Sequence, residues 1–192
     1  NEASRPPLAR YEQARVMGGG SSINGQVASR GLPDDYDEWA QLGASGWSWD
    51  DVRPFFCRLE RDLDFNGPNH GKDGPVPIRR IFPDNWDGLT RAAAASFAEM
   101  GFEYRPDMND TELPGYSAAP GTNAYGRRVS TAIAYLTPTV RARGNLTIQA
   151  GTTVTRILFE DRRAVGVEIV SGSEKKIIRA SSVVVSAGAI HT

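Results

Sequence analysis

The segment Arg15–Gln26 is the part of this chain best suited to bind a ligand. Its three consecutive glycines, 18 to 20, leave no Cβ on one face of the backbone, so a flat or charged group can contact the main chain directly. Ser21 and Ser22 follow with hydroxyl and amide donors where a helix can begin, and helix N-termini attract phosphate. Asn24 adds a side chain that both donates and accepts, as the edge of a heterocycle requires. A glycine run alone is a weak signal for a ligand site, because most such runs are simple loops.

Further motifs follow this segment in a fixed order along nearly the whole chain. They are Ser29–Trp39, Gly43–Phe56, His70–Pro75, Gly126–Ser130, Arg143–Thr147, Val154–Leu158 and Ser186–Ile190. Together with the glycine segment they resemble the glucose–methanol–choline (GMC) oxidoreductases, flavoenzymes that oxidise alcohols. The residues from Met17 to Trp39 are most similar to bacterial members that act on primary and aryl alcohols.

The resemblance implies that this chain supplies part of an FAD site. By similarity, Gly18, Gly19, Gly20 and Ser21 lie along the pyrophosphate and ribityl chain. Asn24 and Gly25 approach the isoalloxazine, and Val154 gives backbone hydrogen bonds to adenine. The implied cofactor-binding residues are Gly18, Gly19, Gly20, Ser21, Asn24, Gly25 and Val154.

Each of these assignments has a simpler structural alternative. A glycine can serve a turn that needs a positive φ, and Asn24 can be a turn residue. Arg15 is either a phosphate contact or part of a surface ion pair, and Ser186–Gly188 is expected near the adenosine end of the cofactor. Some relatives carry a histidine that bonds covalently to the flavin where this chain has Ile23, so FAD is expected to be non-covalent.

The resemblance also implies the reaction, in which a hydride passes from an alcohol carbon to flavin N5. The proton acceptor of the family is a histidine near the C-terminus, which this chain lacks. We therefore predict no catalytic residue here. His70, in a loop rich in Gly, Pro and Asn, is expected to be solvated or structural.

Both ends suggest a piece of a longer protein. Asn1–Ala14 has no core-forming pattern, and Ser182–Ser186 is a β-branched run typical of a strand buried in a sheet. The strand, Gly-x-Gly-x-x-Gly turn and helix with which the family holds the ADP part of FAD are absent. The isolated chain should therefore bind FAD weakly or not at all, and an exposed Val183–Val185 edge would favour self-association.

Composition excludes several other classes of protein. In 192 residues, 22 basic side chains face 23 acidic ones, which argues against nucleic acid as a partner. No apolar run approaches the roughly 20 residues of a membrane span, and no signal peptide is recognisable, so a cytoplasmic location is expected. Cys57 is expected to be a buried, inert thiol, and one cysteine and two distant histidines make a metal site improbable. The expected partner is a small-molecule alcohol.

Periodicity predicts helices interleaved with a β portion, and hence an α+β fold. The resemblance implies that this is an internal fragment of a glutathione-reductase-type FAD-binding domain with an antiparallel meander, plus part of the substrate domain. The predicted segments are 1–75 (FAD cradle and helices), 76–144 (partial substrate domain) and 145–192 (meander and returning strand). Helices are expected over Tyr36–Leu42 and after an N-cap at Ser48, with Asp51 in capping-box position and Pro54 near the first turn. A helix over Trp86–Met100, with Asp84 or Asn85 as cap and Gly101 as its stop, is expected to pack its apolar stripe in the core; the stripe is Leu89, Ala93, Phe97 and Met100. A further helix is expected from Ser130 to Pro138. Strands are expected over Val76–Ile81, Leu146–Gln149, Val154–Phe159, Ala164–Val170 and Lys176–Arg179. Hairpin turns are expected at Asp161–Arg162 and Ser171–Ser173.

Three functions remain open from the sequence. The leading one is part of an FAD-dependent alcohol oxidase or dehydrogenase, two activities that the sequence does not separate. The second is a lyase on the same scaffold, in which FAD takes no redox part. The third is a domain that is non-catalytic as it stands.

Overall fold

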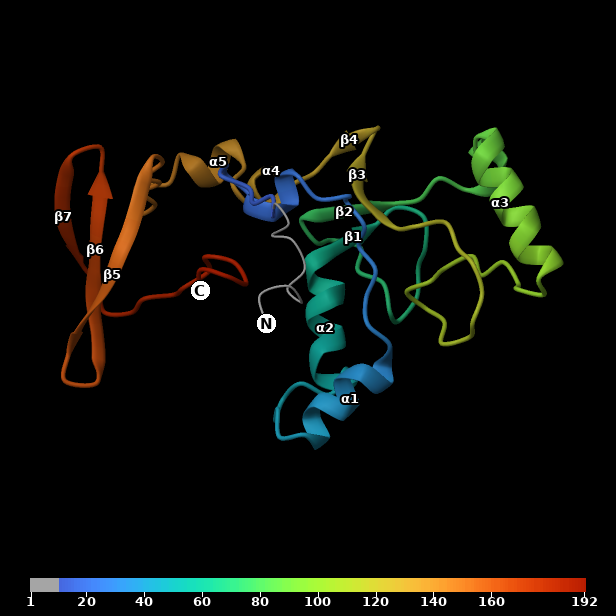
Figure 1. Cartoon of the computed structure of the whole chain (residues 1–192), viewed down its shortest axis with the longest axis horizontal. Coiled ribbons are helices and arrows are strands. Elements are labelled where there is room, and N and C mark those ends of the chain that lie inside the picture. The colour runs from blue at the N-terminus through green and yellow to red at the C-terminus, as the bar shows by residue number, and fades with distance from the viewer. Residues whose placement is uncertain (1–10) are drawn as a thin grey trace, which may run out of the picture. The chain divides into compact units, whose positions relative to one another are not determined.

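A computed structural model describes residues 11–192 of the chain. These residues form two compact units, residues 11–143 and residues 144–192, each described by itself (Figure 1). The first unit combines helices with a small mixed sheet, and the second is an antiparallel sheet. The predicted α+β class is confirmed. The predicted lack of core elements in Asn1–Ala14 falls largely on residues outside the described range.

Two helices follow the glycine segment, α1 (Pro33–Gln41) and α2 (Trp49–Leu59). The first begins earlier than predicted, since Pro33 occupies the first helical position and the Asp35 carboxylate accepts from the Leu32 amide at 2.8 Å. Ser48 caps α2 as predicted, and the Asp51 carboxylate accepts from the Ser48 amide at 3.1 Å. Pro54 lies inside α2 and not in its first turn, which corrects the prediction.

The cap of α2 allows a direct test. Replacing Ser48 with alanine should lower the free energy of unfolding by about 1 kcal/mol, because the Asp51 amide loses its side-chain acceptor. Urea unfolding would measure it, with Ser45→Ala as a matched control in the same exposed loop. Equal stability of the two variants would contradict this role for Ser48.

Tyr36 joins α1 to α2 through aromatic contacts. Its ring centroid lies 5.7 Å from that of Trp49 and 5.8 Å from that of Phe56. Such pairs add to the stability gained from burying the rings. The two helices therefore form one packed corner below the sheet in Figure 1.

The first unit contains a four-stranded sheet in the order β1-β2-β3-β4. Its strands are β1 (Glu60–Asp62), β2 (Val76–Arg79), β3 (Gly121–Ala124) and β4 (Arg127–Arg128). β1 and β2 are parallel and the other pairs antiparallel. The predicted strand Val76–Ile81 is real but ends at Arg79. Val76, Ile78, Ala118 and Pro120 form the small buried core around the sheet.

The loop between β1 and β2 crosses the end of α2 at very short range. A Cβ on Gly71 would lie 1.7 Å from the Cys57 carbonyl oxygen, and one on Gly74 would lie 2.4 Å from that of Glu60. Only glycine fits at these two positions. Cys57 itself is half-buried, not fully buried as predicted, with its thiol 3.6 Å from the Pro68 carbonyl oxygen.

Helix α3 (Gly88–Glu99) differs from its prediction in two ways. Asp87 caps it, accepting from the Thr90 amide at 2.7 Å, because Asp84 and Asn85 belong to a separate 3₁₀ turn, Pro83–Asn85. Its apolar stripe was predicted to pack in the core, but Leu89 is 83% exposed and Met100 70% exposed. The predicted stop at Gly101 is confirmed by its φ of 88°.

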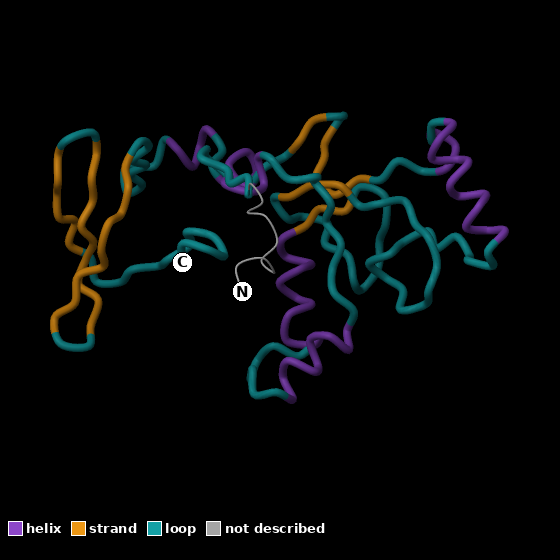
Figure 2. Tube along the Cα trace, viewed as in Figure 1, coloured by secondary structure: helices purple, strands orange, loops and turns teal. Residues whose placement is uncertain are grey.

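The segment after β4 forms two short helices, α4 (Thr131–Tyr135) and α5 (Pro138–Arg141). Thr137 caps α5 and Pro138 occupies its first position, so the proline divides the predicted helical region. Loops account for much of the first unit, as the teal trace shows (Figure 2).

The second unit is the predicted meander, with strand order β5-β6-β7. Its strands are β5 (Thr152–Glu160), β6 (Arg163–Ser171) and β7 (Glu174–Arg179). The turns lie where predicted, with positive φ at Asp161 and Gly172. Leu146–Gln149 is not a strand, so that prediction was wrong. Ser182–Ser186 is unpaired among the described residues and Val184 is 87% exposed, in agreement with the exposed edge expected at Val183–Val185.

Within the described residues, no helix combines the length and apolar character needed to cross a membrane.

Candidate functional site

The glycine segment forms a tight turn followed by a 3₁₀ helix, Gly19–Ser22. Gly18 and Gly19 have φ values of 90° and 52°, which glycine adopts readily. A Cβ on Gly18 would lie 2.6 Å from the Ser22 hydroxyl and 3.1 Å from that of Ser130. Gly18 is therefore required both by its turn and by close packing.

The remaining glycines of the segment present open backbone. A Cβ built on Gly19, Gly20 or Gly25 would meet no atom of the described residues within 4 Å. Neighbouring side chains do not fill the space beside these three positions. The segment thus has one packed glycine and three that a ligand can approach.

The segment is held by the start of α4. The Ser21 hydroxyl accepts from the Thr131 amide at 2.9 Å and donates to the Gly18 carbonyl at 2.5 Å. The Ser22 hydroxyl donates to the Met17 carbonyl at 2.8 Å. Both serine hydroxyls therefore donate to the backbone of the segment and fix it, so neither has a free proton to offer a ligand.

Asn24 has the turn role that was considered for it as one alternative. Its Oδ1 accepts from the Gln26 amide at 3.0 Å, as in a turn, and from Arg128 Nη1 at 2.8 Å. The side chain is exposed, and its amide nitrogen has no hydrogen-bond partner among residues 11–192. The turn contact therefore leaves the donor side of Asn24 available.

Val154 belongs to the second unit, where it lies on the edge strand β5. The register of β5 against β6 shifts between Val154 and Arg156, so the ladder is irregular there. A cavity of about 780 Å³ adjoins this position and is lined also by Val183, Val184 and Val185. An edge strand leaves backbone donors and acceptors unpaired, as adenine recognition requires.

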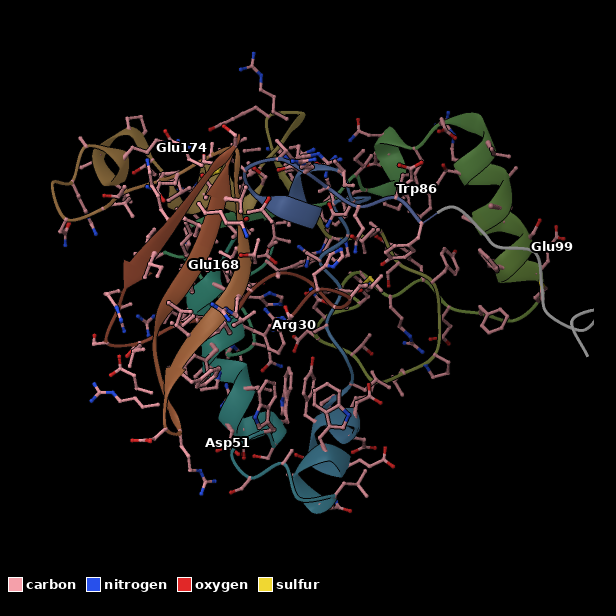
Figure 3. The ribbon with its side chains drawn as sticks, turned by 60° about the vertical axis from the view of Figure 1, so that its left-hand side comes forward. Arg30, Asp51, Trp86, Glu99, Glu168 and Glu174 are labelled. Carbon is pink, nitrogen blue, oxygen red and sulfur yellow. The ribbon has the colours of Figure 1, made fainter. Side chains whose placement is uncertain are left out.

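A buried ion network, which the sequence did not reveal, lies beside the sheet of the first unit. Its members are Arg30, Glu60, Asp62, His70, Arg80 and Asp107. Arg30 lies 2.6 Å from Glu60, and Arg80 lies 2.9 Å from Asp62 and 3.0 Å from Asp107. Arg30, labelled in Figure 3, comes from the extended segment that joins the glycine turn to α1.

His70 is the centre of this network. Its Nδ1 lies 3.1 Å from Asp62 and its Nε2 lies 2.8 Å from Asp107. Contacts with Asp107, Asp62 and Glu60 raise the pKa of His70 to about 11, against the opposing effect of burial. Burial raises the pKa of Asp62, Glu60 and Asp107, but the contacts of each with His70, with an arginine and with backbone amides together outweigh it, so each pKa is lowered. His70 is structural, one of the two predicted alternatives.

The network anchors the glycine segment. Beside Arg30, the Asn109 side chain accepts from the Arg30 amide at 3.0 Å and donates to the Ala28 carbonyl at 3.1 Å. Ala28 in turn donates to the Pro120 carbonyl at 2.8 Å. The chain leaving Gly25 is therefore fixed to the core within a few residues.

Glu60, Asp62 and His70 place one potential metal-ligand atom each within 4.8 Å of one another. Arg30 and Arg80 already compensate these carboxylates, and both ring nitrogens of His70 face carboxylates. A metal would have to displace these cations at a high electrostatic cost. The cluster is better explained as an ion network than as a metal site.

The raised pKa of His70 predicts the direction of a pH effect. Since its folded pKa of about 11 exceeds its ordinary value of 6.5, the histidine stabilises the fold fully below pH 6.5. That stabilisation is lost as the pH rises toward 11. The unfolding free energy should therefore fall with pH across this window by at most about 1.4 kcal/mol per pH unit. Urea titrations should show a flatter profile for His70→Gln; parallel profiles would contradict the role of His70.

Comparison with known proteins identifies the family to which the chain belongs. Residues 7–192 match the family model described as GMC oxidoreductase. The chain belongs to the GMC oxidoreductase family, whose members bind FAD.

Two curated relatives are similar over almost the whole chain. The 5-(hydroxymethyl)furfural oxidase of Methylovorus sp. (strain MP688) is 38% identical over 99% of this chain and 37% of its own length. An oxygen-dependent choline dehydrogenase of Rhizobium etli (strain CIAT 652) is 38% identical over 94% of this chain and 32% of its own length. The chain thus spans about a third of the length of these relatives.

Two solved structures are similar to this chain in fold. Pyridoxine 4-oxidase from Mesorbium loti superposes with a TM-score of 0.82 at 32% identity, over 88% of this chain and 33% of that one. An FAD-dependent oxidoreductase from Chaetomium thermophilum superposes with a TM-score of 0.78 at 28% identity, over 88% and 31% of the two chains.

Proposed function

We propose that this chain is part of a longer FAD-dependent enzyme that oxidises the CH–OH group of a small alcohol. Family membership supports this, since the relatives include an oxidase and a dehydrogenase of small molecules. The observation that carries it is the open backbone at Gly19, Gly20 and Gly25 on a segment anchored from both sides.

The residues present fit an FAD nucleotide. Gly18 shapes the turn, Gly19 and Gly20 offer bare backbone to the pyrophosphate and ribityl chain, and Ser21 contributes main-chain groups. Asn24 and Gly25 would hold the isoalloxazine, with the unpartnered amide donor of Asn24 available to it. Val154 would give adenine its backbone hydrogen bonds. When bound, the flavin supplies the hydride acceptor.

We assign no catalytic base to this chain. A base must be able to take the hydroxyl proton. His70 already holds its proton at neutral pH, since its pKa is raised to about 11 by Asp107, Asp62 and Glu60. The base would then belong to the portion that the relatives have beyond this chain. Ile23, an aliphatic residue, offers no atom for a covalent flavin link, so the cofactor is non-covalent.

The experiment is anaerobic addition of alcohols to the full-length protein. We expect a yellow protein whose visible flavin bands bleach when a primary or aryl alcohol is added. A colourless protein, under conditions that retain non-covalent FAD, would contradict the proposal. Flavin that stays oxidised with every alcohol would favour the lyase instead. Measuring peroxide formation alongside reduction of an artificial electron acceptor would distinguish an oxidase from a dehydrogenase.

Two further expectations concern the isolated chain and the cell. The 192-residue chain alone should bind FAD weakly and self-associate through the exposed segment around Val184. Stoichiometric FAD in the purified chain would contradict the first expectation. A strictly monomeric sedimentation profile would contradict the second. A cytoplasmic location stays a prediction that cell fractionation would test.

A further inference from the structure

A cavity of about 640 Å³ lies beside the glycine segment. Gly25 and Gln26 form one part of its wall, and Arg79, Arg80, Trp86 and Asp87 form others. Trp86, labelled in Figure 3, precedes α3 by two residues in the chain. The volume lies within the range of small-molecule sites, roughly 300–1,000 Å³. Because Gly25 is expected to adjoin the flavin ring, a ligand in this cavity would lie next to that ring.

Arg79 gives the cavity an uncommitted positive charge. It ends β2, where its backbone is in register with Gly121 of β3. Its side chain is exposed and forms no ion pair or hydrogen bond with any residue of the described range 11–192. A guanidinium in a cavity wall is a strong, directional partner for a carboxylate.

The two other charged residues of the wall are already engaged. Arg80 pairs with Asp62 and Asp107 in the buried ion network. Asp87 accepts from the Thr90 amide as the cap of α3, and this contact lowers its pKa. Arg79 is therefore the one charge of the described wall that has no internal partner.

Gln26 supplies an unsatisfied acceptor in the same wall. Its Oε1 is buried and has no hydrogen-bond partner among the described residues. Its φ of 64° is unusual for a residue with a side chain, and such strain is often kept at functional sites. The backbone is fixed there because the Gln26 amide donates to Asn24 and the Gln26 carbonyl accepts from the Thr122 amide at 2.8 Å. A buried amide oxygen without a partner calls for a donor on the ligand.

We propose that this cavity binds a small hydroxy acid. Its carboxylate pairs with Arg79, and its hydroxyl donates to Gln26 Oε1. This rests on the proposed function and deepens it, since it names alcohols that carry an anionic group as the substrate class. Arg79 is then a determinant of specificity and Gln26 a residue that positions the hydroxyl.

The test uses three ring compounds of nearly equal shape on the full-length protein. 4-Hydroxybenzoate carries both groups, 4-hydroxybenzamide lacks the charge, and 4-methylbenzoate lacks the hydroxyl. None of them has a CH–OH group, so binding is measured without turnover and independently of flavin chemistry. Isothermal titration calorimetry at neutral pH gives the three dissociation constants.

We expect the unsubstituted protein to bind 4-hydroxybenzoate about tenfold or more tightly than either analogue. Arg79→Gln should remove the preference for acid over amide, and Arg79→Lys should restore part of it. Gln26→Met should remove only the preference for hydroxyl over methyl. Arg58→Gln, at an exposed position in the last turn of α2, is the control and should change neither preference.

The proposal is overturned if the unsubstituted protein fails to bind 4-hydroxybenzoate, or binds the acid and the amide equally. This comparison needs no variant, so it decides even if Arg79→Gln does not fold. It is also overturned if Arg79→Gln weakens the acid and the amide alike. Flavin absorbance in the same samples reports separately on the proposed function. A yellow protein that binds the acid no more tightly than the amide would overturn the hydroxy-acid proposal and leave the proposed function standing.

Discussion

Leucine in place of Gly20 should lower the affinity of the full-length protein for FAD by at least about tenfold. A side chain at Gly20 would enter space that no atom of the described residues occupies within 4 Å, so the fold itself should tolerate it. The same side chain would stand where the cofactor is expected to contact bare backbone. Flavin fluorescence titration of the FAD-free protein measures the affinity, and thermal unfolding of that form measures the fold.

Gly88→Leu is the matched control. A Cβ on Gly88, at the start of α3, likewise meets nothing within 4 Å, but Gly88 lies outside the predicted cofactor residues. It should retain FAD. Equal affinity for FAD in both variants would show that the open face of Gly20 does not receive the cofactor.

The second large effect concerns the buried ion network. Replacing Arg80 with methionine should lower the free energy of unfolding by about 3–5 kcal/mol, because it leaves buried carboxylates without their cation. The Arg80 side chain is fully buried and contacts both Asp62 and Asp107. Urea unfolding, followed by tryptophan fluorescence, would measure the loss.

A surface ion pair provides the comparison for Arg80. Arg179 lies 2.7 Å from Glu160, and both side chains are about two-thirds exposed. Arg179→Met should therefore cost about 0–1 kcal/mol, since solvent screens the pair. Similar losses for the two variants would mean that the buried network contributes no more than an exposed pair.

Features encoded within a few residues could be predicted from the sequence. The capping box of Ser48 and Asp51 is one, and the hairpin turn at Gly172 is another. In the first the Ser48 and Asp51 side chains bind neighbouring backbone, and in the second glycine allows a positive φ. Tertiary contacts therefore have little influence on whether either feature forms. The turn of the glycine segment was expected for the same reason.

The ion network could not be predicted because its members lie far apart along the chain. The alternation of Glu60 and Asp62 indicates one face of a strand, but nothing local places Arg30 or Asp107 beside them. Helix α3 shows a related limit. Periodicity identifies which residues share an apolar face, yet not what covers it, and Leu89 lies open among the described residues.

The most direct measurement is a crystal structure of the full-length protein with FAD bound. We expect the nucleotide in van der Waals contact with the main chain of Gly19, Gly20 and Gly25, and adenine hydrogen-bonded to the backbone of Val154. A structure in which those glycines are covered by protein, with the flavin bound elsewhere, would contradict the account.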